Sequence, residues 1–76
     1  MYHYLVIIEK GDTSYGAYVP DLPGCVAVGD TRADVERDIR DAIALHLEGL
    51  ARDGEPIPTP ASTAIYLDVP LPDHAG

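Results

Sequence analysis

The chain has 76 residues, of which 46% are apolar, and five basic residues stand against thirteen acidic ones, for a formal net charge of −8. This length predicts a single domain over residues 1–76, with a core so small that self-association would support it. So few cations cannot form the basic patch that nucleic acid or an anionic membrane surface requires. The charge instead favours a basic protein partner.

Cysteine and histidine are too sparse to predict a disulfide, a metal or a cofactor. Cys25 is the only cysteine, and His3, His46 and His74 lie far apart without a ligand-like spacing. No stretch approaches the roughly 20 apolar residues of a membrane span, and no signal-peptide pattern is present. We therefore expect a cytoplasmic protein with no membrane association, which is consistent with a lone thiol.

The first half of the chain predicts three short strands, at residues 2–9, 14–19 and 25–28, which are rich in β-branched, aromatic or small apolar residues. The connections between them are too short for crossovers, so the three strands should form an antiparallel meander. The end of the first strand is apolar on both alternating faces. This pattern predicts a helix over one face and a second copy of the chain over the other.

The segment between the second and third strands, Val19–Cys25, contains two prolines, an aspartate and a glycine. Proline fixes φ and cannot donate a backbone hydrogen bond, so a strand cannot pass through both prolines. The segment predicts a rigid corner, which has little conformational freedom to lose when it binds a partner. Cys25 at its end is interpreted as a buried core residue, with a reactive nucleophile as the alternative.

A helix is predicted over residues 32–53, with Thr31 as its N-cap and Gly54 after its C-terminus. Its apolar residues recur at the helical period and form one continuous stripe: Val35, Ile39, Ala42, Ile43, His46, Leu47 and Leu50. Asp34, Asp38 and Asp41 share another side of the helix. We interpret them first as a solvated face, then as an acidic strip facing a partner, and last as a metal site.

The end of the chain predicts one more strand. Residues 55–60 contain three prolines and predict an extended linker, whereas residues 63–69 alternate apolar and polar side chains as a strand does. Residues 70–76 predict a frayed tail. The complete expectation is an α+β domain of order β-β-β-α-β, in which one helix packs on a small antiparallel sheet.

The segment Gly16–Cys25, followed by Gly29-Asp30-Thr31 and an acidic amphipathic helix, resembles the HicB antitoxin family over roughly residues 3–69. The resemblance implies a partial ribonuclease-H-like fold. It also implies a non-enzymatic antitoxin of a type II toxin-antitoxin system, which binds and inhibits a HicA-type toxin, a small basic ribonuclease that cleaves mRNA. Many family members carry a C-terminal DNA-binding segment. Because this sequence stops at Gly76, we expect a short form without direct DNA binding.

The partner surface expected from these patterns combines shape and charge. Asp21, Leu22 and Pro23 of the corner should provide shape, and Asp34, Asp38 and Asp41 should steer a basic toxin. The chain itself should form a homodimer or a tetramer built from dimers. Two alternatives remain: a solitary oligomeric HicB-like protein with a regulatory or scaffold role and no toxin partner, and a metal-dependent hydrolase that uses its aspartates.

Overall fold

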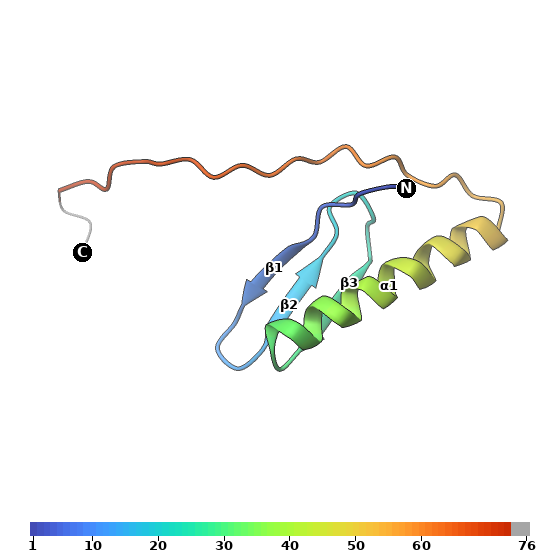
Figure 1. The fold of residues 1–76 in the computed structure, drawn as a ribbon, viewed down its shortest axis with the longest axis horizontal. Helices are drawn as coiled ribbons and strands as arrows, with labels where there is room; N and C mark the ends of the chain where they lie inside the picture. The colour runs from blue at the N-terminus through green and yellow to red at the C-terminus, as the bar shows by residue number, and fades with distance from the viewer. Residues whose placement is uncertain (74–76) are drawn as a thin grey trace.

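The computed structural model describes residues 1–73 and contains three strands followed by one helix (Figure 1). The strands are β1 (Ile7–Lys10), β2 (Tyr15–Tyr18) and β3 (Val26–Gly29), and the helix is α1 (Arg32–Arg52). The sheet has the order β1-β2-β3, and both pairs are antiparallel. The predicted α+β class, the meander and the helix are confirmed.

The first strand is shorter than its sequence predicted, because β1 begins at Ile7 and not at Tyr2. Ile7 pairs with Tyr18, the last residue of β2, after which the chain turns into the corner that begins at Pro20. Residues 1–6 therefore extend past the end of their only neighbouring strand and have no backbone partner there.

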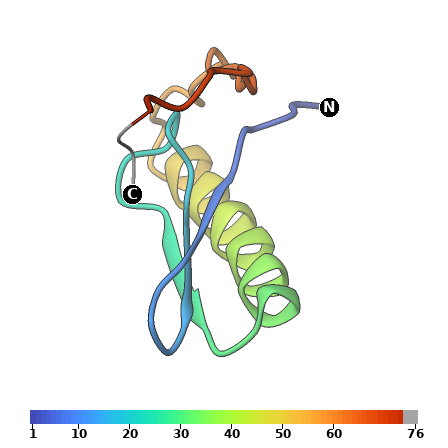
Figure 2. The same ribbon diagram turned by 90° about the vertical axis from the view of Figure 1, so that its left-hand side faces the viewer.

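Helix α1 lies across one face of the sheet, so the domain has two layers (Figure 2). The Thr31 hydroxyl accepts a hydrogen bond of 3.0 Å from the Asp34 amide and caps the first turn. Val35 and Ile39 are buried against Ala17 of β2, and the predicted stripe continues with partly buried Ala42, Ile43 and Leu47. Burial of each large aliphatic side chain contributes about 1.5–3 kcal/mol to stability.

The corner between β2 and β3 is part of the core. Val19, Leu22 and Cys25 are all buried, and Leu22 has no exposed surface at all. Their backbones also bond to one another: the Leu22 amide donates to the Val19 carbonyl at 3.0 Å, and the Cys25 amide donates to the Leu22 carbonyl at 3.1 Å. Pro20 and Pro23 have no amide hydrogen to donate, and the Leu22 and Cys25 amides find their acceptors within the corner. The corner therefore satisfies these backbone groups without a neighbouring strand.

The second face of the sheet is apolar and open. Tyr18 lies beside Ile7 and Val26 in the register, and Val26 and Val28 are 62% and 70% exposed. That a second copy of the chain covers this face stays a prediction.

Among the described residues, no helix has the length and apolar character that crossing a membrane requires.

The predicted fourth strand is wrong for this chain taken by itself. Residues 55–73, which we call the C-terminal arm, run from the end of α1 along the domain and past the sheet (Figure 1). Residues 63–69 alternate as predicted, but within residues 1–73 they belong to no sheet. Alternation makes a segment competent to pair, whereas a strand also needs a neighbour for its backbone groups. Residues 74–76 of the predicted tail lie outside the described residues.

Substitution of Gly24 tests the corner, because this glycine has a φ of +85°, in the left-handed region that β-branched residues avoid. We expect Gly24→Val to lower the free energy of unfolding by about 1–3 kcal/mol in urea denaturation. The matched control is Gly16→Val in β2, where an added Cβ meets no atom within 4 Å and φ is negative or extended. Equal stabilities of the two variants would contradict the turn geometry.

Candidate functional site

The base of the C-terminal arm is clamped to the corner by Asp21. One carboxylate oxygen of Asp21 accepts hydrogen bonds from the Ala61 and Ser62 amides at 2.9 and 3.0 Å, and the other accepts from the Ser62 hydroxyl at 2.8 Å. The Ser62 and Ala61 amides, and then the Ser62 hydroxyl, hold the pKa of the Asp21 carboxyl below its usual value. All three bonds favour the ionised form of the carboxyl.

A tyrosine near the N-terminus holds the arm a few residues earlier. The Tyr4 hydroxyl donates a hydrogen bond to the Pro58 carbonyl, and the Tyr2 ring packs edge-on against Tyr4 with centroids 6.0 Å apart. Desolvation raises the pKa of the Tyr4 hydroxyl, and Tyr2 and Asp21 add to the shift. Tyr4 therefore stays a neutral donor, and the arm is tied to the domain at two points.

The three corner residues predicted to contact a partner have different positions. Leu22 faces the core and has no exposed surface, so its assignment to a partner surface must be corrected. The Asp21 carboxylate already receives hydrogen bonds from the arm. Pro23 and the neighbouring Gly24 are exposed and form the outward tip of the corner. A partner could reach this tip, whose shape depends on Leu22 beneath it.

The three helix aspartates lie along one exposed side of α1, as their spacing predicted, and two of them, Asp34 and Asp38, share a cation. Arg37 lies 3.3 Å from Asp34 and 3.3 Å from Asp38, and the three side chains remain between 41% and 65% exposed. Ion pairs this exposed contribute little stability. Asp41 is exposed one turn further along. We call Asp34, Asp38 and Asp41 the acidic strip.

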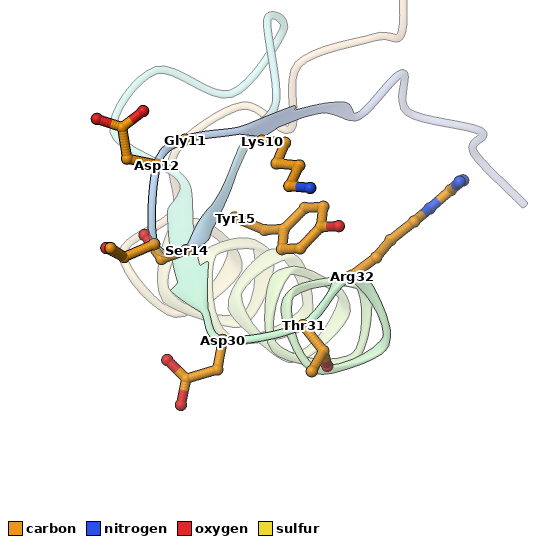
Figure 3. Close-up of a pocket in the computed structure, with 9 residues that line it drawn as sticks. Lys10, Gly11, Asp12, Ser14, Tyr15, Asp30, Thr31 and Arg32 are labelled. Carbon is orange, nitrogen blue, oxygen red and sulfur yellow. The ribbon is translucent and has the colours of Figure 1, made fainter.

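A polar hollow of about 330 Å³ lies where the β1–β2 turn meets the start of α1 (Figure 3). Lys10, Arg32 and the Tyr15 hydroxyl lie on one side of it, and Asp12 and Asp30 point away on the other. Charges of both signs therefore border the hollow. Over residues 1–73, no group of three or more His, Cys, Asp or Glu side chains is placed to hold a metal ion.

Cys25 agrees with its interpretation as a core residue. Its side chain is buried beside the corner, and burial raises the pKa of the thiol. A buried neutral thiol is a poor nucleophile, because the reactive form is the thiolate.

Two solved structures that resemble this chain come from toxin-antitoxin systems. The chain is 37% identical to the N-terminal domain of the antitoxin HicB of Burkholderia pseudomallei, with a TM-score of 0.69 over 76% of this chain and 69% of that one. It is 35% identical to a chain of the HicA3 and HicB3 toxin-antitoxin complex, with a TM-score of 0.67 over 79% of this chain and 70% of that one. The fold is therefore that of a HicB antitoxin domain.

The sequence model of the HicB-like antitoxins of bacterial toxin-antitoxin systems matches residues 4–75, and the chain belongs to this family. It is 36% identical to an uncharacterized 14.9 kDa protein of Haemophilus phage HP1, over 88% of this chain but only 50% of the phage protein. It is 39% identical to a UPF0150 protein of Synechocystis, over 76% of this chain and 75% of that protein. The chain thus spans half the length of its phage relative.

The Asp21 clamp predicts a pH-dependent arm. A depressed pKa in the folded state means that the clamp contributes fully above the ordinary carboxyl pKa of about 3.9 and is lost as pH falls through the lower folded value. Amide hydrogen exchange of Ala61 and Ser62 should therefore accelerate, beyond the intrinsic pH effect, only in strong acid. Asp21→Ala, which removes the acceptor, should abolish that acid step and leave both amides fast at neutral pH. Asp68→Ala, at an exposed arm position, is the control, and slow exchange in Asp21→Ala would contradict the clamp.

Proposed function

We propose that this chain binds and inhibits a HicA-type toxin, a small basic protein that cleaves mRNA. The observation that supports this function best is the likeness to a chain of the HicA3 and HicB3 toxin-antitoxin complex, which extends over 79% of this chain at 35% identity. The family and the net charge of −8 point the same way. In this proposal the chain acts in the cytoplasm as a binding protein and catalyses no reaction.

The acidic strip is the surface we assign to the approach of the toxin. Its three carboxylates lie on the outer side of α1, away from the core, and Arg37 offsets only part of their charge. A toxin that binds RNA must present cations to phosphates, and an acidic face attracts the same cations. Inhibition then follows from occupation of the RNA-binding surface.

The corner is the second part of this surface. Pro23 and Gly24 project from it, and their backbone is held by Leu22 in the core and by the bonds between Val19, Leu22 and Cys25. A rigid projection loses little conformational entropy on binding, so it supports affinity while the acidic strip speeds encounter. Asp21 contributes through the arm that it positions.

A direct assay tests the function. The purified chain is titrated into a HicA-type toxin taken from an adjacent gene, and cleavage of a labelled RNA is followed at 50 mM and 300 mM salt. We expect inhibition that becomes complete at a simple molar ratio and weakens at the higher salt, because screening reduces the attraction.

Absence of both binding and inhibition at 50 mM salt would contradict the proposal and would favour a solitary oligomer with no toxin partner. RNA cleavage by the chain alone would contradict it in a different way. A toxin variant without cleavage activity, measured for binding by calorimetry, separates loss of binding from loss of inhibition.

Neutralising the acidic strip tests its steering role. We expect the triple variant Asp34→Asn, Asp38→Asn, Asp41→Asn to lower the association rate constant about tenfold at low salt, with a much smaller change in the dissociation rate. The control removes the same charge elsewhere, with Asp12→Asn, Asp53→Asn and Glu55→Gln. Equal losses in both triple variants, measured by stopped-flow fluorescence, would assign the effect to net charge and not to the strip.

A further inference from the structure

Helix α1 leaves a groove open between itself and β1. The cavity there has a volume of about 420 Å³, and we call it the β1 groove. Four apolar side chains line it, Val6, Ile8, Ile39 and Ile43, together with the charged Arg32, Glu36 and Arg40. Ile39 is buried, but Val6, Ile8 and Ile43 are only partly covered. A groove with partly covered apolar residues beside a sheet is a place that a further strand could fill.

The outer edge of β1 also lacks a backbone partner. In the described sheet β1 pairs only with β2, so the amides and carbonyls on its other side are unpaired. Exposed edges of this kind recruit strands, and many proteins bind extended segments in this way. The groove and the edge lie on the same strand, so one segment could satisfy both.

The C-terminal arm has the character of the missing strand. Ile65, Leu67 and Val69 alternate along it and are between 72% and 74% exposed. Pro70 follows directly and would end the pairing, because proline has no amide to donate. An extended segment whose alternate side chains are apolar and mostly exposed to water is unstable in isolation and is stabilised by pairing with a sheet edge.

The charges of the arm and the groove are complementary. Lys10, Arg32 and Arg40 border the β1 groove and the adjoining cavity, and they are three of the five basic residues of the chain, with Glu36 as the one acid beside them. The described arm has three acids, Glu55, Asp68 and Asp73, and no base, since the last basic residue is Arg52. Most basic residues of this acidic chain therefore border the groove in which the arm of a second copy would lie.

The arm does not fill the groove of its own chain. Tyr66 is the arm residue that borders the adjoining cavity, next to Val6 and Ile8, and its side chain is fully exposed. Ile65, Leu67 and Val69 are exposed as well, and none of them lines the β1 groove. The clamp of Ala61 and Ser62 by Asp21 fixes the base of the arm in this position.

We propose that residues 63–69 of the arm add a fourth strand to β1 of a second copy of this chain, with Ile65, Leu67 and Val69 in the β1 groove of that copy. Exchange of both arms gives a symmetric dimer, in which each chain adds its residues 63–69 to β1 of the other chain and binds the same residues of the other chain at its own β1. The fourth strand of the fold is then supplied by the partner copy. The proposal concerns self-association and does not depend on toxin binding.

A pair of adjacent substitutions tests the exchange. Leu67→Asp places a carboxylate in the groove, and we expect it to raise the dimer dissociation constant at least about tenfold. Tyr66→Asp adds the same group at the next residue, on the opposite face, and should leave the dimer intact. Both side chains are exposed in the single chain, so neither variant should unfold it. Light scattering and sedimentation over a range of concentrations give the masses.

Isotope-filtered NMR identifies the occupant of the groove. In a mixture of labelled and unlabelled chains, we expect NOEs between Leu67 methyl groups of one chain and Ile8 or Ile43 methyl groups of the other. The same NOEs within a single monomeric chain would mean that the arm closes on its own β1 and would overturn the proposal. A wild-type monomer with a free arm, or a dimer that Leu67→Asp leaves unchanged, would overturn it as well.

Discussion

The rest of the structure depends on the rigid corner between β2 and β3. Its prolines end β2, and its three internal backbone hydrogen bonds let Val19, Leu22 and Cys25 enter the core together. From the same turn, Asp21 points outward and holds the base of the C-terminal arm 40 residues later in the sequence. The same short segment therefore packs against the helix through its buried side chains and holds the arm through the exposed carboxylate of Asp21. With only six buried core residues among residues 1–73, this small domain depends strongly on a corner that both fills the core and holds the arm.

The two proposed contacts use different charges and different sides of α1. The side with Asp34, Asp38 and Asp41 is acidic and suits a basic toxin. The side with Arg32 and Arg40 borders the β1 groove and suits the acidic arm of a second copy. Because the strip and the groove have opposite charges, each would favour its proposed partner and disfavour the other. A dimer formed through the arms would leave both acidic strips free.

Much of the fold could be predicted from local patterns. The helix begins and ends within one residue of its prediction, because its cap at Thr31 and its apolar stripe are encoded by neighbouring residues. The length of β1 could not be predicted, since it depends on where β2 ends. Burial of Leu22 and the clamp between Asp21 and Ser62 also escaped prediction, because both join the corner to distant parts of the chain. The last strand was predicted from alternation, which shows that a segment can pair but not which neighbour it pairs with.

The central claim is that this chain carries two separate protein-binding surfaces, one for a toxin and one for its own copy. Native mass spectrometry of the chain mixed with a HicA-type toxin tests this claim most directly, because it counts both components in one particle. We predict a dominant species with two copies of the chain and two of the toxin. A species with one copy of each, formed at the expense of the chain's dimer, would show that the two partners compete for one surface and would contradict the account.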